Sequence, residues 1–426
     1  MRVNRAYSDA LKNAASLSDV EHKSLTDALT QIEKEIESGK LDDQSFPLGS
    51  FDVRLAELAK DAARKLNLGR GSAEQMSTAL RLWLLDEVDA LSALIAGLQR
   101  ALIQQAEKHV ATLMPGYLNF RPVQVLSCSH WLLSYFWMLT RDQERLSAVI
   151  GRTSSLPLGS GILAGSLYRL DRRELAHALD FSDESRNSMD AVGDLDFCAE
   201  FLFAAVLLGV HLNRLADDLL MFANPSLGFV TIDAAYVGHT SLDSNFSIKP
   251  EKQVSSVNAG SARLLGEMTG FIAALRTLPA AFSAETPESR QAVFEASDLL
   301  RTMLTTLDGS VSTLTIHPDR MFDALEERIL ASDLVDYLVG RGESYDRAHQ
   351  VLEKLFARAE NTGKPISETD LSDLQKESAA FDADVFAIFD YSRSVAQRAT
   401  IGGTAPAAIR SQIRQAMNWL VEAGLE

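Results

Sequence analysis

Residues 72–113 constrain the fold more than any other part of the chain. Their apolar side chains recur at steps of three and four residues, which is the spacing of one face of an α-helix. At 1.5 Å per residue a helix of this length would be about 60 Å long. A single compact domain has no need of so long a helix, so the stretch predicts a bundle of long helices. The apolar positions are Met76, Leu80, Trp83, Leu91, Leu94, Ile95, Leu98, Leu102, Val110 and Leu113.

The rest of the chain supports an all-α fold. Comparable segments run at 121–150, 190–223, 254–281 and 288–313, and alternation of period two is nearly absent. Ser18 and Glu21 have the spacing of a capping box and predict a helix that starts there. Residues 197–222 are apolar on more than one face, so this helix must be buried on most sides, which favours subunit association.

Turn signals divide the chain into three predicted domains. Glycines at 340, 342, 363 and 402 separate shorter helices near the C-terminus from the long ones. We expect an N-terminal helical domain at 1–71, a central long-helix bundle at 72–323 and a small C-terminal helical domain at 324–426. At 426 residues, with 46% of them hydrophobic, the chain can bury more than one core.

The net charge and the cysteine content limit the kinds of partner and of site that we expect. The net charge of -17, from 58 acidic and 41 basic residues, argues against nucleic acid and anionic membranes as partners. The two cysteines, Cys128 and Cys198, lie in apolar helical stretches, so we expect neither a disulfide framework nor a thiolate metal site. No HExxH or paired Cys/His spacing is present, so no metal is proposed. The first residues form no apolar leader, and we expect a cytoplasmic protein.

Several motifs together point to one family. Residues 156–165 read LPLGSGILAG, residues 187–192 read NSMDAV, and residues 114–117 read MPGY, alongside SHW at 129–131 and HLNRLA at 211–216. Over nearly its whole length the chain resembles argininosuccinate lyase, of the aspartase/fumarase superfamily. The resemblance implies a three-domain helical subunit in a homotetramer with a shared core of about twenty helices. It also implies active sites assembled from three subunits, with no cofactor.

The chemistry that the resemblance implies needs a base, an acid and many hydrogen-bond donors. A proton leaves the carbon beside a carboxylate, nitrogen is expelled, and fumarate remains. The base of the family is a serine on a loop of pattern GSSxMPxKxN, and residues 238–252 read GHTSLDSNFSIKPEK here. One alignment puts Ser241 on the paired serines, whereas the other recovers Pro250 and Lys252 but puts Phe246 at the catalytic position.

Neither alignment of this loop recovers the whole motif. The candidate catalytic residues are therefore Ser241, Ser247 and His239, and the candidate substrate-binding residues are Lys249 and Lys252. The alternative is that the serines only solvate a flexible segment and that the histidine is merely exposed.

A second family segment, THLQ, reads LNFR at residues 118–121. Asn119 keeps hydrogen-bond donors and an acceptor but does not titrate, so it can bind a substrate and cannot be the acid. The alternative is a turn residue that joins two helices. Arg121 stands in place of glutamine and adds positive charge where an anion would bind.

A third segment, HTGRSRNDQ, reads NLGRGSAEQ at residues 67–75, so Gly69, Arg70 and Gln75 match. Arg70 and Gln75 are candidate substrate-binding residues, with Arg70 as a carboxylate fork. A surface or interface ion pair is the alternative for Arg70. Asn187 and Arg290 complete the candidate set, with Arg290 at the place of a family lysine.

These replacements leave two hypotheses about function. The first is an enzyme that eliminates or adds at a carbon-nitrogen bond of a small carboxylate-bearing molecule other than argininosuccinate. The second is a catalytically inactive structural or regulatory homologue. Because each donor lost around a developing anion costs about a hundred- to thousandfold in rate, ordinary argininosuccinate cleavage is not expected.

Overall fold

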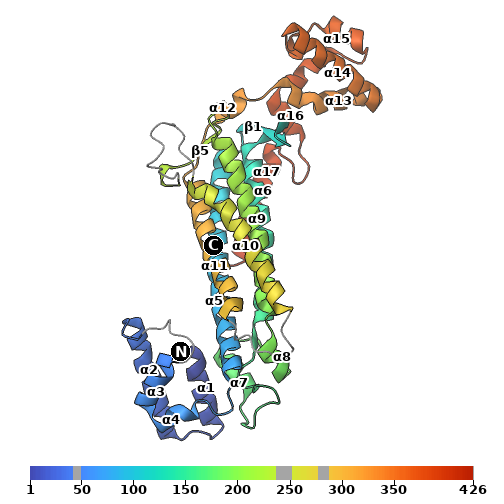
Figure 1. Ribbon diagram of the computed structural model, residues 1–426. Coiled ribbons are helices and arrows are strands. Elements are labelled where there is room, and N and C mark those ends of the chain that lie inside the picture. The colour runs from blue at the N-terminus through green and yellow to red at the C-terminus, as the bar shows by residue number, and fades with distance from the viewer. Residues whose placement is uncertain (42–48, 237–251, 277–286, 426) are drawn as a thin grey trace. The chain divides into compact units, whose positions relative to one another are not determined.

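The computed structural model describes residues 1–41, 49–236, 252–276 and 287–425. Helices make up 72% of the protein, which confirms the all-α prediction. The described strands form three two-stranded pairs, β1 with β2, β3 with β4 and β5 with β6. The elements are labelled in Figure 1.

Four helices form the N-terminal part of the chain: α1 (Arg2–Asn13), α2 (Asp19–Glu37), α3 (Gly49–Ala59) and α4 (Asp61–Lys65). The predicted capping box of α2 is confirmed, since Ser18 Oγ accepts a hydrogen bond from the Glu21 amide and the Glu21 carboxylate accepts one from the Ser18 amide. Apolar side chains of these helices share one buried core, which includes Tyr7 and Leu29.

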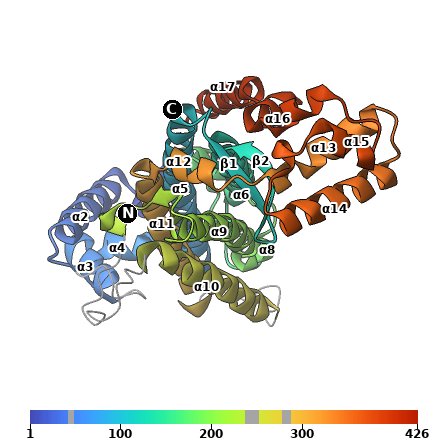
Figure 2. The ribbon, with the colours of Figure 1, turned by 90° about the horizontal axis from the view of Figure 1, so that it is seen from above.

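Five long helices follow: α5 (Ser72–Lys108), α6 (Cys128–Thr153), α9 (Asp196–Ala223), α10 (Lys252–Leu275) and α11 (Pro287–Ser312). They confirm the prediction of a bundle of long helices, and segments of them lie side by side in both views (Figures 1 and 2).

The predicted ends of two helices are wrong. The chain leaves α5 at Lys108 and forms an antiparallel hairpin, β1 (Leu113–Leu118) with β2 (Arg121–Ser127). Pro115 and Gly116 in β1 and Pro122 in β2 do not suit a helix interior, whereas Val123 and Val125 favour a strand. The three- and four-residue spacing of apolar side chains led to a predicted helix end at Leu113, but this side chain is buried as part of the hairpin and not of the helix. It packs with Val125 and a separate apolar cluster, Leu325, Ile329, Leu330 and Val395.

Short elements connect the long helices, and none was predicted individually. They are β3 (Ser155–Leu156), α7 (Arg172–Ala178), β4 (Asp183–Glu184), α8 (Ser188–Gly193), β5 (Val230–Thr231), η1 (Ala234–Tyr236), β6 (Thr315–Ile316) and α12 (Pro318–Asp323). Strands β3 and β4 are parallel, and β5 and β6 are antiparallel.

The C-terminal part has a core of its own. Leu334, Leu338, Val351, Leu355 and Phe381 are among its buried side chains. Its elements are η2 (Glu327–Leu330), α13 (Ala331–Gly340), α14 (Tyr345–Thr362), η3 (Ile366–Glu368), α15 (Leu371–Glu377), η4 (Ala383–Phe389), α16 (Tyr391–Gln397) and α17 (Pro406–Glu422).

Backbone contacts divide the chain into two compact units. Unit 1 contains Met1–Ser92, Gln143–Leu207 and Ala262–Leu300, and unit 2 contains Ala93–Asp142, Leu208–Ser261 and Arg301–Glu426. The cuts fall inside the five long helices. The three-domain division at 71/72 and 323/324 stays a prediction.

Helix α9 is, within the described residues, the one helix whose length and apolar composition would suffice to cross a membrane. Half of its most apolar window is buried in the protein. Its polar side chains also have protein partners: His211 Nδ1 lies 2.7 Å from Asp142 Oδ2, and Asp218 accepts hydrogen bonds from Trp131 Nε1 and Tyr135 Oη. These features are those of a core helix.

Candidate functional site

Unit 1 holds a cluster of Asn4, Asn67, Arg70 and Gln75, here called the amide-arginine cluster. Arg70 donates from Nη1 to Asn4 Oδ1 at 2.7 Å and from Nη2 to Asn67 Oδ1 at 2.9 Å. Gln75 Nε2 donates to the same Asn4 oxygen at 3.3 Å. The structure thus brings the two predicted residues Arg70 and Gln75 together and adds Asn4, which the sequence did not single out.

The hydrogen-bond partners of Arg70 are neutral amides. Its guanidinium carbon lies 5.0 Å from the centre of the Tyr7 ring. Burial lowers the pKa of Arg70 to about 10, so the group is still cationic at neutral pH. Among the described residues no carboxylate is hydrogen-bonded to the guanidinium, although the charges of Glu74 and Asp52 oppose the lowering of its pKa. This arrangement suits a guanidinium that receives an anion.

Local chain geometry positions Arg70. Gly69 has φ +69°, and a Cβ at this residue would lie 2.4 Å from the Tyr168 side chain. Only glycine fits there. The Tyr7 hydroxyl donates to the Leu68 carbonyl at 2.7 Å, which fixes the turn that precedes α5.

The loop at residues 159–161 holds a carboxylate of the chain itself. Glu74 is buried, and its carboxylate accepts hydrogen bonds from the amides of Gly71, Gly159 and Gly161 and from the Ser160 hydroxyl. We call these four residues the glycine nest. Burial raises the pKa of Glu74, and the hydrogen bonds from the nest oppose that rise.

Glu74 was missed as an organising residue. The available signal was its position, since it stands where the family motif has aspartate. The glycine-rich stretch that follows Pro157 is therefore a structural turn that binds an internal anion.

An acidic pocket of about 230 Å³ lies in the same unit. It contains four carboxylates and two arginines, which makes it suited to a cationic nitrogen. Arg81 pairs with Asp194 and lies 4.1 Å from the Phe197 ring, and its Nη1 donates to the Thr153 carbonyl at 3.1 Å. The lining residues are Arg81, Ser155, Asp183, Glu184, Ser185, Arg186, Asp190, Ala191 and Asp194.

Hydrogen bonds connect this pocket to the segment that carries the glycine nest. Arg172 donates to the Leu156 carbonyl at 2.8 Å and to the Ser185 carbonyl at 2.7 Å. Ser185 lines the acidic pocket, and Leu156 begins the segment that leads to Gly159.

Asn187 and Arg290 lie in unit 1 as well. Asn187 is the N-cap of α8, where its Oδ1 accepts from the amides of Met189 and Asp190 at 2.9 and 3.2 Å. Arg290, near the start of α11, contacts the Met76 sulfur at 3.7 Å, and its buried Nε has no hydrogen-bond partner within the described residues. Substrate binding by these two residues stays a prediction.

The hairpin in unit 2 carries Asn119 and Arg121. Leu118 pairs with Arg121, so Asn119 and Phe120 form a two-residue turn with φ of 50° and 61°. The alternative that Asn119 is a turn residue is confirmed, but the expectation that the turn joins two helices is wrong, because it joins two strands. Positive φ suits asparagine but strains a bulky side chain, and Phe120 is 86% exposed.

The remaining predicted residues lie outside what the structure describes. Ser241, Ser247, His239 and Lys249 fall in the segment 237–251, and the Lys252 side chain, at the start of α10, is likewise not described. Both alignments of the loop thus stay open. Among the described residues, no group of three or more His, Cys, Asp or Glu could hold a metal ion.

We expect the pKa of His130, on α6, to lie below its ordinary value of about 6.5. Burial lowers this pKa, and the buried Nδ1 has no hydrogen-bond partner in the described structure. The unfolded chain then binds the proton more tightly. The contribution of neutral His130 to stability is therefore complete above the unfolded pKa and is lost progressively as the pH falls from the unfolded to the folded pKa.

Imidazole NMR titration of the folded protein measures this directly, with the His130→Gln variant to assign the resonance. The variant should also show a smaller loss of stability between neutral and mildly acid pH. A pKa at or above that of the urea-unfolded chain would contradict the expectation.

Comparison with known proteins gives the family to which the chain is similar. A family model described as Lyase matches residues 1–252, and one described as Argininosuccinate lyase C-terminal matches residues 328–396. The argininosuccinate lyase of Roseiflexus sp. (strain RS-1) is 37% identical over 430 residues, which cover 99% of this chain and 93% of the relative. That of Schizosaccharomyces pombe is 34% identical, with 96% of this chain and 89% of the relative covered.

Solved structures show the same fold. An EDDS lyase variant with bound fumarate has a TM-score of 0.88 at 23% identity, covering all of this chain and 86% of that one. A 3-carboxy-cis,cis-muconate lactonizing enzyme from Pseudomonas putida has a TM-score of 0.79 at 20% identity, with 98% and 93% covered. The chain therefore belongs to the argininosuccinate lyase family, within the aspartase/fumarase superfamily of lyases.

Proposed function

We propose that the protein is a carbon-nitrogen lyase whose substrate is a small carboxylate-bearing molecule other than argininosuccinate. The observation that carries the proposal is Arg70, a cationic guanidinium held by two amide side chains. Such a group binds a substrate carboxylate and stabilises the extra charge that develops on it when the neighbouring carbon loses its proton.

The acidic pocket supports the carbon-nitrogen part of the proposal. A substrate of such a lyase carries a carboxylate at one end and a basic nitrogen at the other. Unit 1 offers a cationic group at Arg70 and an excess of carboxylates around Arg81 and Asp194. The glycine nest around Glu74 and the hydrogen bonds of Arg172 stiffen the segment that connects the region of Arg70 to the acidic pocket.

The proposal that the substrate differs rests on the hairpin. Asn119 replaces the family histidine and cannot transfer a proton near neutral pH. Phe120 is exposed on a strained turn where glycine would be unstrained, and such strain is commonly retained where a side chain is used. Ser241, Ser247 and His239 are our candidates for the proton-handling groups, with Lys249, Lys252, Arg121 and Arg290 as further anion contacts.

We also propose a cytoplasmic homotetramer with active sites between subunits. Large apolar side chains are exposed on the long helices of the isolated subunit, which supports burial against other copies. They are Phe203, Leu265, Ile272 and Phe294, with exposed fractions of 54, 52, 48 and 40%.

The substrate assay offers purified protein argininosuccinate and, separately, a panel of other N-substituted aspartates, and follows the release of fumarate. We expect no fumarate from argininosuccinate and release from at least one other compound. Turnover of argininosuccinate at an ordinary rate would overturn the substrate proposal and keep the reaction class. Failure of every compound, together with failure to bind fumarate, would favour a catalytically inactive homologue.

A further inference from the structure

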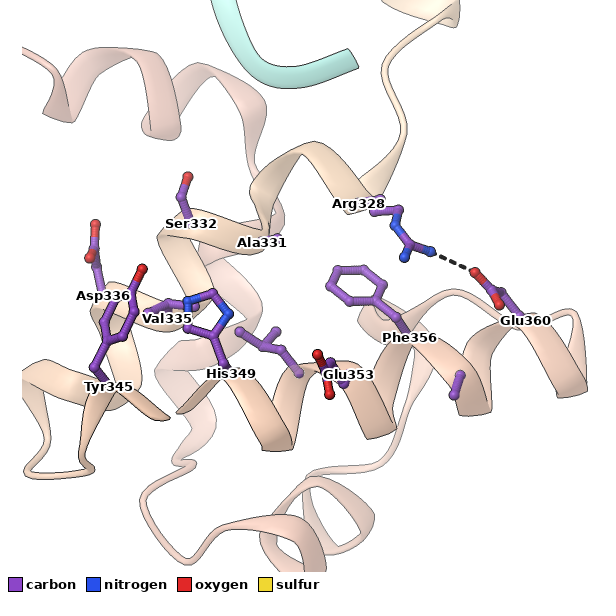
Figure 3. Close-up of a pocket in the computed structure, with 12 residues that line it drawn as sticks. Arg328, Ala331, Ser332, Val335, Asp336, Tyr345, His349, Glu353, Phe356 and Glu360 are labelled. Carbon is purple, nitrogen blue, oxygen red and sulfur yellow. Dashed lines mark hydrogen bonds and ion pairs between the residues drawn. The ribbon is translucent and has the colours of Figure 1, made fainter. Parts of the chain in front are cut away.

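A pocket of about 410 Å³ lies between α13 and α14, in unit 2, and the function proposed above does not use it. Both helices belong to the C-terminal core, and Arg328 of η2 completes the lining of the pocket. Its size lies within the range of about 300–1,000 Å³ that small-molecule sites occupy. Figure 3 shows the side chains that line it.

The charged groups of this α13–α14 pocket leave an excess of negative charge. Three carboxylates, Asp336, Glu353 and Glu360, line the pocket together with one arginine, Arg328. Arg328 Nη1 lies 2.6 Å from Glu360 Oε1, so the charges of these two residues cancel at one end of the pocket (Figure 3). Asp336 and Glu353 have no ion-pair partner among the residues that the structure describes.

The uncharged walls of the pocket are apolar and aromatic. Val335 and Leu352 are buried and form its base. The Phe356 ring lies 5.3 Å from the Arg328 guanidinium carbon, which shows that a planar cation fits against this wall. At the other end Tyr345 and His349 stack edge to face with centroids 4.5 Å apart, and Tyr345 is 63% exposed.

We propose that the α13–α14 pocket binds an organic cation, with an ammonium or guanidinium head on an apolar stem. The head is placed against one of the two unpaired carboxylates, Asp336 or Glu353, which lie apart in Figure 3, and beside the aromatic side chains of the pocket, which attract cations. The stem lies on Val335 and Leu352. An anion is disfavoured there, because two free carboxylates would repel it and the arginine is already paired.

The binding test uses the full-length protein at pH 8 and four probes of one stem length: butylammonium, butylguanidinium, butanol and butyrate. Ligand-observed NMR, followed by calorimetry, measures their affinities. We expect both cations to bind and the other two probes to fail. Butylguanidinium should bind more tightly than butylammonium if the aromatic wall contributes most of the affinity. The order of the two affinities reverses if the carboxylates contribute most.

Variants identify the site. The double variant Asp336→Asn with Glu353→Gln should bind the cations about tenfold more weakly. Glu422→Gln, an exposed change on α17, is the matched control and should leave the affinity unchanged. Melting curves confirm that each variant is folded.

Three results would overturn the proposal: butanol binding as well as the cations, no cation binding at all, or an equal loss in Glu422→Gln. None of them bears on the lyase proposal, because the α13–α14 pocket shares no residue with the amide-arginine cluster.

Discussion

Replacing Arg70 by alanine is expected to weaken the binding of fumarate by about a hundredfold. Fumarate is the probe because it carries the carboxylates that the proposed reaction leaves behind. The guanidinium is the cationic donor of the amide-arginine cluster, and its hydrogen bonds to Asn4 and Asn67 hold it in one orientation. Removing it leaves the ligand carboxylate without a cationic partner.

The Arg70→Lys variant separates charge from geometry. Lysine keeps the charge but lacks the planar fork, so we expect it to recover only part of the lost affinity. Arg173→Ala, at an arginine on α7 whose side chain is 88% exposed, is the control and should bind fumarate as the unchanged protein does. Titration calorimetry at neutral pH measures all three. Full affinity in a folded Arg70→Ala variant would remove the basis of the proposed function.

The long helices could be predicted because each buries an apolar stripe, which repeats visibly in the sequence. The α2 capping box was equally visible, since Ser18 and Glu21 are three residues apart. Such features depend on neighbours in the chain, so the sequence alone contains them.

The hairpin was missed for a physical reason. Four consecutive residues of β1 are buried, so the strand lacks the alternation of a half-buried strand, and the apolar run continues that of α5. Pro115, Gly116 and Pro122 were the sequence signals against a helix, and the pairing of Leu113–Leu118 with Arg121–Ser127 is what establishes the hairpin.

The sequence identified the cationic residue of the candidate site, but it did not identify the residues that hold this cation in place. Arg70 and Gln75 were visible because they match a motif, whereas Asn4 and the nest around Glu74 come from distant segments. The local role of Asn187 could have been read from sequence, because asparagine followed by Ser188 and Asp190 is typical of a helix N-cap.

Replacing Glu74 by alanine is expected to lower the free energy of unfolding by about 3–5 kcal/mol. The change removes the acceptor shared by the amides of Gly71, Gly159 and Gly161 and by the Ser160 hydroxyl. A buried donor without an acceptor loses its hydration and gains nothing in return. Glu74→Gln keeps one acceptor oxygen and should cost less, about 1–2 kcal/mol.

Denaturant unfolding measures these costs, with Glu107→Ala as the control on the same helix. Glu107 is an exposed residue of α5, so its replacement should change stability by about 0.5 kcal/mol or less. The Glu74→Ala variant should also bind fumarate more weakly, because Glu74 holds the amide of Gly71, the residue that follows Arg70. If Glu74→Ala cost no more than Glu107→Ala, the glycine nest would not be a stabilising contact, and the fixed position of Arg70 would need another cause.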